Sequence, residues 1–231
     1  MNRSRKAVFF RIMATIMCAA CVVVMCSGYQ ARAETRILSA YNLRELNSAI
    51  EQAKEGDVIQ IRGEIDISSD LKIPKEQITI QRTSEKDRLI TSMGIETHFQ
   101  NIIFDGGGIK STYPILIVQD NSTIENFIFR NCGDPNFSGG IGSIGVAVQL
   151  NNGKVIFREC DFDVNRAYVG GHVLIGENVV ASFFGCTMKN GYACSGGAIS
   201  VAANASCFLE GCTITENSSM DYGGGIANGG Y

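Results

Sequence analysis

The stretch FRECDFDVNRAYVGGHVLIGENVVAS (residues 157–182) is followed by FFGCTMKNGYACSGGAISVAANASCF (183–208), and LEGCTITENSSMDYGGGIANGGY (209–231) begins the pattern again. Each unit carries a cysteine, an asparagine and a glycine pair at corresponding places. These residues are Cys160, Cys186 and Cys212; Asn165, Asn190 and Asn217; and Gly170-Gly171, Gly196-Gly197 and Gly223-Gly224. Self-similarity at a fixed period predicts a repeat architecture, in which stacked units bury a shared core.

Short runs of alternating apolar and polar residues fill these units, for example around Ile199 and Val201 and around Cys207 and Leu209. Alternation predicts strands with one buried face, and no helical spacing interrupts it here. A unit of this length with two or three strands matches one coil of a parallel β-helix, whose coils stack at about 4.8 Å. Equivalent side chains should then form ladders. The predicted ladders are Phe157 over Phe183 over Leu209, and Cys160 over Cys186 over Cys212.

Two short motifs recur within the units. Gly196 to Ile199 reads GGAI, and Phe162 to Asn165 reads FxxN. The pair resembles the repeat signature of chlamydial polymorphic outer membrane proteins and similar bacterial surface proteins, which belong to the pectin-lyase-like right-handed β-helix class. The resemblance covers about residues 120–231 and departs at two FxxN positions: Met188-Lys189-Asn190 is one residue short, and Ile214 replaces Phe. It implies a secreted or cell-surface solenoid, often an adhesin passenger.

Residues 1–33 are typical of a secretory signal peptide, with basic residues before an apolar stretch at 12–25 and a small-residue cleavage site at Ala31-Arg32-Ala33. The alternatives are a transmembrane anchor, for which the apolar stretch is short, and a lipoprotein at Cys21 or Cys26, whose preceding residues fit a lipobox poorly. We therefore expect a secreted or cell-surface protein, located outside the cell, in the outer membrane or in the cell wall. We expect no membrane contact of the mature segment.

Charge constrains the partners. The chain has 20 basic and 23 acidic residues, and five of the basic residues but none of the acidic ones lie in residues 1–33. The remaining segment, residues 34–231, therefore has 15 basic and 23 acidic residues and a net charge of −8. This argues against nucleic acid or an anionic membrane surface as a partner. An extracellular polysaccharide or a host or cell-surface ligand remains as the expected partner.

The segment 34–231 is expected to be one all-β domain, a right-handed parallel β-helix with coils over about 57–231. An amphipathic helix over about 42–54, begun by Asn42 and Glu45 as a capping box, should cover its first coil. The alternative is an unrelated small α/β start. No closing segment follows the last glycine turn, so we expect a C-terminally incomplete chain with a downstream anchor or barrel domain as one option.

Six cysteines lie beyond the signal peptide: Cys132, Cys160, Cys186, Cys194, Cys207 and Cys212. An even number in a secreted chain is compatible with disulfides, but the three ladder cysteines cannot all pair among themselves, so a reduced, packed ladder is expected. His98 and His172 are far apart in sequence and no CxxC occurs in this segment. We therefore predict no metal site and no cofactor.

The β-helix class also contains polysaccharide lyases and glycoside hydrolases, which use clustered carboxylates. The catalytic candidates here are Asp134, Asp161, Asp163 and Arg166, with the excursion at residues 131–140 as a candidate binding loop. One coil further on, the positions of Asp161, Asp163 and Arg166 are held by Thr187, Lys189 and Tyr192, so no carboxylate ladder forms.

We therefore expect a structural or adhesin-like module without catalysis in this segment, the candidate charges being solvated turn residues. The alternative is the N-terminal part of a polysaccharide lyase or glycoside hydrolase. A third option is a non-catalytic glycan-binding solenoid that uses Tyr168, Tyr192 and Tyr222.

Overall fold

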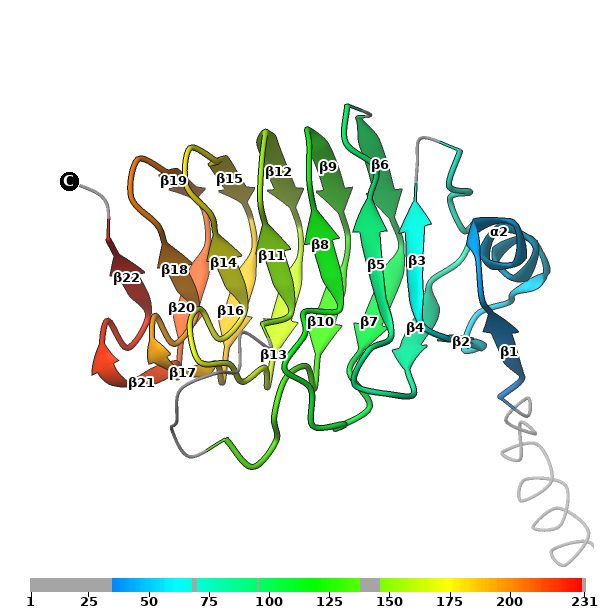
Figure 1. Ribbon diagram of the computed structural model, residues 1–231, viewed down its shortest axis with the longest axis horizontal. Coiled ribbons are helices and arrows are strands. Elements are labelled where there is room, and N and C mark those ends of the chain that lie inside the picture. The colour runs from blue at the N-terminus through cyan, green and yellow to red at the C-terminus, as the bar shows by residue number, and fades with distance from the viewer. Residues whose placement is uncertain (1–34, 68–69, 95, 138–145, 230–231) are drawn as a thin grey trace, which may run out of the picture. The chain divides into compact units, whose positions relative to one another are not determined.

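The computed structural model describes residues 35–67, 70–94, 96–137 and 146–229, which form a parallel β-solenoid with one short helix (Figure 1). The expected signal peptide at 1–33, residues 138–140 of the expected excursion and the last two residues lie outside the described residues. The predicted all-β parallel solenoid is confirmed.

Four sheets run along the solenoid, and neighbouring strands within each are parallel. Sheet A contains β1 (Ile37–Ala40), β2 (Val58–Ile61), β4 (Ile78–Arg82), β7 (Ile102–Asp105), β10 (Ile128–Arg130), β13 (Asp161–Asp163), β16 (Thr187–Lys189) and β20 (Thr213–Thr215). Sheet B contains β3 (Glu64–Ile67), β5 (Arg88–Thr91), β8 (Leu116–Val118), β11 (Val148–Leu150), β14 (Val173–Ile175), β18 (Ile199–Val201) and β22 (Ile226–Asn228). Sheet C contains β6 (Thr97–Gln100), β9 (Ser122–Glu125), β12 (Lys154–Arg158), β15 (Val180–Phe184) and β19 (Ser206–Glu210). Sheet D contains β17 (Tyr192–Ser195) and β21 (Ser218–Tyr222).

Inward side chains stack from coil to coil, as the repeat predicts. The rings of Phe157 and Phe183 lie parallel with centroids 4.7 Å apart, and Phe183 is in register with Leu209. Leu209 retains 39% exposure because it lies on β19, the outermost strand of sheet C. Because each coil buries its apolar residues against its neighbours, the core is continuous from sheet A to sheet C.

The helix α2 (Leu43–Gln52) begins where the sequence predicts. The Asn42 side chain accepts a hydrogen bond from the Glu45 backbone N–H at 3.0 Å, and Glu45 accepts one from the Tyr41 N–H at 3.0 Å. Its buried side chains, Leu46, Ala49 and Ile50, join the core beside β1 to β3.

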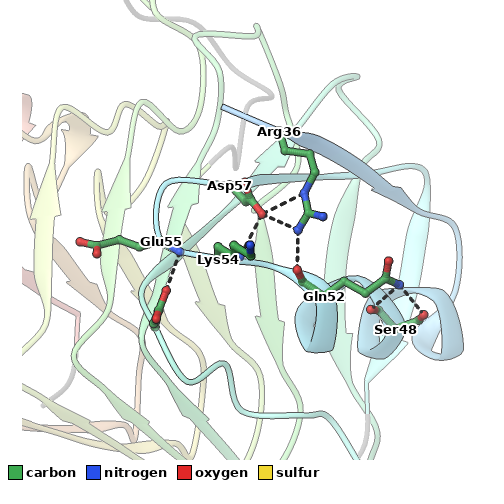
Figure 2. Close-up of polar contacts among 7 residues, drawn as sticks. Arg36, Ser48, Gln52, Lys54, Glu55 and Asp57 are labelled. Carbon is green, nitrogen blue, oxygen red and sulfur yellow. Dashed lines mark hydrogen bonds and ion pairs between the residues drawn. The ribbon is translucent and has the colours of Figure 1, made fainter. Parts of the chain in front are cut away.

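An ion pair connects the end of α2 with the strands on either side of it (Figure 2). Asp57 accepts from the Lys54 backbone N–H at 2.9 Å and from Arg36 Nη2 at 2.7 Å, and Arg36 also donates to the carbonyl of Gln52. The Lys54 N–H and then the Arg36 guanidinium hold the pKa of Asp57 below its usual value. The contacts join the residue before β1 to the residue before β2.

In each regular coil, a single residue in the left-handed conformation turns the chain on either side of the sheet A strand; further left-handed residues, such as Gly170 and Asn178, lie at the coil's other bends. The first bend joins sheet C to sheet A, and its left-handed residues are Asn101, Asn126, Glu159, Gly185 and Gly211. The second bend follows the sheet A strand, and its left-handed residues are Asn131, Val164, Asn190 and Glu216. Asparagine and glycine recur because they adopt positive φ at lower cost than other residues.

The second bend corrects one part of the predicted repeat. Since Asp163 is in register with Lys189, Asn190 corresponds to Val164, and Gly191 takes the place of Asn165. The asparagine expected to recur in every unit is therefore absent from the middle one.

Candidate functional site

Four charged side chains of alternating sign form a column on the outer face of sheet A. Register pairs Asp105 with Arg130, Arg130 with Asp163, and Asp163 with Lys189. The Arg130 Nε lies 2.9 Å from Asp105 Oδ2, and the Lys189 Nζ lies 3.6 Å from Asp163 Oδ2. We call these four residues the charge ladder.

Two of the predicted catalytic candidates, Asp161 and Asp163, share the outer face of β13. Asp163 belongs to the charge ladder and also accepts a hydrogen bond from Asn190 Nδ2 at 2.8 Å. Asp161 is exposed and is opposite Thr187, as the repeat predicts. The two carboxylates thus lie on one strand, one in an ion pair and one in solvent.

The other two candidates lie beyond the second bend. Asp134 is buried, with Lys110 Nζ 3.2 Å from Oδ2 and the Asn136 N–H donating to Oδ1 at 3.0 Å. Arg166 is in register with Gly133 and with Tyr192, and its guanidinium lies 5.6 Å from the centroid of the Tyr192 ring. The four candidates are therefore divided between the face of sheet A and the neighbouring loop, with different partners.

A small hollow of about 140 Å³ opens beside this loop. Its lining residues are Gly108, Asn131, Cys132, Pro135, Val164 and Arg166. Of the four predicted candidates, Arg166 alone is in this lining, and ligand pockets typically enclose about 300–1,000 Å³. The hollow is large enough to admit part of a ligand, such as one ring, at the surface.

Beneath Arg166, the buried Asn165 organises a polar network that the sequence did not predict. Its Oδ1 accepts from the Cys132 backbone N–H, and its Nδ2 donates to the Phe129 carbonyl, both at 2.9 Å. The same Nδ2 lies 2.9 Å from His172 Nδ1. Asn165 therefore joins the backbone of the preceding coil to a buried histidine.

The network continues through His172 to Asn217, two coils from Asn165. His172 Nε2 lies 3.1 Å from Asn217 Oδ1, which also accepts from the Gly191 N–H at 2.8 Å, while Asn217 Nδ2 donates to the Met188 carbonyl at 2.8 Å. A Cβ at Gly191 would lie 2.2 Å from the Gly197 carbonyl oxygen and 2.7 Å from His172 Nε2. The Gly197 backbone and the imidazole thus occupy the space that an asparagine side chain at position 191 would need.

Burial lowers the pKa of His172 from 6.5 to about 4, and hydrogen bonding to Asn217 opposes this in part. The imidazole is neutral at pH 7, with Nδ1 accepting from Asn165 and Nε2–H donating to Asn217. Together the three side chains form what we call the amide–imidazole spine. It supports the bend from which Arg166 projects.

The three tyrosines proposed for sugar stacking do not form one column. Tyr192 is in register with Arg166 and Ser218, whereas Tyr222 is opposite Ser195. The Tyr192 ring also contacts Phe137 edge-on, with centroids 6.0 Å apart. Of these tyrosines, Tyr192 lies beside Arg166 on the neighbouring coil and contacts its guanidinium.

Within the described ranges, no group of three or more His, Cys, Asp or Glu side chains is arranged to hold a metal ion. None of the helices in the same part of the chain has the length and apolar character needed to cross a membrane. No protein-family model, curated protein or solved structure matches this chain. The resemblance to polymorphic outer membrane proteins and to the pectin-lyase-like class therefore stays a prediction.

Proposed function

We propose that this protein is a secreted or cell-surface right-handed β-helix of the pectin-lyase-like class, acting as a structural or adhesin-like module without catalysis in this segment. The charge ladder is the observation that supports this most. Asp105 and Asp163 are each paired with a cation of an adjacent coil. Carboxylates used in this way stabilise the stacking of coils and are less available as acids, bases or metal ligands.

The arrangement of the solenoid supports the same role. Its strands repeat from coil to coil and form extended outer faces, which suit contact with another surface. Right-handedness is the rule for parallel crossover connections. In this proposal α2 covers the first coil, because its buried side chains join the core beside β1 to β3.

The decisive test separates this module from a polysaccharide-degrading enzyme. The full chain is incubated with acidic and neutral polysaccharides, and unsaturated products and new reducing ends are measured for the wild type and for Asp161→Asn and Asp163→Asn. We expect no turnover by any of the three proteins. If the wild type degrades a polysaccharide and either variant does not, the protein is a polysaccharide-degrading enzyme instead.

Location needs its own experiment, with the full chain produced in a bacterial host and traced by antibody in secreted, envelope and cytoplasmic fractions. We expect it outside the cytoplasm, shortened by about the predicted signal peptide. A full-length protein confined to the cytoplasm would contradict secretion.

Glycan binding is a second candidate function, favoured by Arg166 over the half-buried Tyr192 ring next to the hollow. An aromatic ring beside a cation and backbone donors can stack on a sugar. The test is binding to a glycan panel by the wild type and Tyr192→Ala. Tyr41→Ala, which removes a 63%-exposed tyrosine beside α2, is the matched control. Loss of binding in Tyr192→Ala alone would support this candidate, and equal binding by all three would reject it.

A further inference from the structure

Three thiols occupy one structural position in successive coils. Cys160, Cys186 and Cys212 each follow the left-handed residue of the first bend. Backbone hydrogen bonds of 2.9 Å connect Thr187 N–H to the Cys160 carbonyl and Thr213 N–H to the Cys186 carbonyl. The predicted cysteine ladder is therefore present, and all three thiols are free in the structure.

The spacing of the coils suits a covalent link between neighbours in this ladder. On the other side of Cys186 and Cys212, the Gly185 N–H donates to the Glu210 carbonyl at 2.9 Å, so the two cysteines lie opposite each other. Adjacent parallel strands are about 4.8 Å apart, within the Cα separation of about 4.4–6.8 Å found for disulfides. The spacing of the two coils therefore meets the distance requirement for a disulfide between them.

Exposure distinguishes the members of the ladder. Cys160 is fully buried and Cys186 is 1% exposed, whereas Cys212 is partly exposed. An oxidant can therefore reach Cys212 first, and Cys186 is the ladder thiol directly below it. We propose that Cys186 and Cys212 form a disulfide that cross-links their two coils, while Cys160 stays a buried thiol.

The reaction needs a small-molecule disulfide or a disulfide-exchange protein as oxidant. The Cys212 thiolate attacks that disulfide, forming a mixed disulfide and releasing one thiol. Cys186 then gives up its proton and attacks the Cys212 sulfur, which forms the Cys186–Cys212 bond and releases the second thiol. Two protein thiols are oxidised and one external disulfide is reduced. Burial raises the pKa of Cys212, which slows the first step, whereas hydrogen bonding from Cys160 lowers the pKa of Cys186, which favours its thiolate in the second step.

The proposal rests on the proposed secretion only for the oxidising compartment that would supply the oxidant in the cell. The chemistry is tested on the purified full chain. The protein is reduced, treated with oxidised glutathione, unfolded in denaturant with excess alkylating agent so that buried free thiols also react, digested and analysed by mass spectrometry. We expect a cross-linked peptide pair containing Cys186 and Cys212, with the mass of two hydrogens lost. Free, alkylatable Cys186 and Cys212, or links from Cys186 to Cys160 or from Cys212 to Cys207, would overturn the proposal.

Three variants sharpen the experiment. Cys212→Ala and Cys186→Ala should abolish the cross-link, and Cys160→Ala, the matched control at the equivalent position, should retain it. Cys212→Ala tests the proposal even if Cys186→Ala fails to fold, because Cys212 is the only partly exposed member of the ladder. A cross-link that forms in vitro in a chain that the location experiment finds confined to the cytoplasm would support this inference and count against secretion.

Discussion

The two bends that flank the sheet A strand of each coil both use a left-handed residue, and they bury different chemistry. At the first bend, the residue after the left-handed position is apolar or a thiol, as in Phe127 and Cys160. At two of the four second bends, the corresponding residue is Asn165 or Asn217, whose amide bonds to backbone groups of other coils, and at the other two it is Cys132 or Gly191. A left-handed residue therefore turns the chain in both places, while the next side chain decides whether packing or hydrogen bonding holds the coils together. The predictions below test this difference.

The largest effect is expected at the first bend. Phe127 is fully buried and contacts the rings of Phe99, Phe104 and Phe129, with centroids 5.6–6.0 Å apart. Phe127→Ala should lower the free energy of unfolding by about 3–5 kcal/mol, because it leaves a cavity among these rings. Chemical denaturation followed by circular dichroism measures this. The outward, half-buried Ile103→Ala is the control, and an equal loss in both variants would contradict a packing role specific to the bend.

At the second bend, Asn165→Ala should lower the free energy of unfolding by about 3 kcal/mol. It leaves the Cys132 N–H and the Phe129 carbonyl without their partner, and each buried unsatisfied group costs about 1–3 kcal/mol. Cys160→Ala, at the corresponding place of the first bend, removes packing atoms and a thiol, which is only a weak hydrogen-bond donor, and should cost about 1 kcal/mol. If Asn165→Ala and Cys160→Ala unfold at the same denaturant concentration, the proposed difference between the two bends is wrong.

The amide–imidazole spine predicts a dependence of stability on pH. The folded pKa of His172, about 4, is below its ordinary value of 6.5, so the unfolded chain binds more protons between these values. The contribution of neutral His172 to the free energy of unfolding is complete above pH 6.5. It is lost as the pH falls, by about 1.4 kcal/mol per pH unit and by about 3 kcal/mol in all. Nearby Asp163 favours the charged imidazole and opposes the effect of burial.

When the free energy of unfolding is measured from pH 7.5 to 4, His172→Gln should lack this part of the pH dependence. His98→Gln, which changes an exposed histidine, should keep it. Parallel slopes for the wild type and His172→Gln would mean that His172 keeps an ordinary pKa.

The smallest effect is an increase in stability. Val164 occupies the left-handed position of the second bend with φ 53°, which is unfavourable for a β-branched residue, and its side chain is 42% exposed. Val164→Asn matches Asn131 and Asn190 in neighbouring coils and should raise the free energy of unfolding by about 1 kcal/mol. The thermal midpoint should rise accordingly. Thr213→Asn, on an exposed strand position, is the control and should lower it slightly.

Much of the fold could be predicted because its causes are local or periodic. The capping residues Asn42 and Glu45 predicted the start of α2, and alternation predicted which residues face inward. The period of the cysteines predicted the register that places Phe157 beside Phe183. The candidate site was predicted less well. The equivalence of Asp163 with Lys189 was foreseen, but the pairing of Asp134 with Lys110 was not, because it depends on how two irregular loops approach each other.

The sequence by itself determined the solenoid, its coil length and its inward ladders, since a repeated pattern of strands and left-handed turns has one way to bury its apolar face. Only the tertiary structure decided that the Gly197 carbonyl and His172 occupy the space beside Gly191. The physical reason is that this space is bounded by residues of three coils, up to 45 positions apart in the chain. The conformational preferences of individual residues do not determine which side chain will occupy such a space.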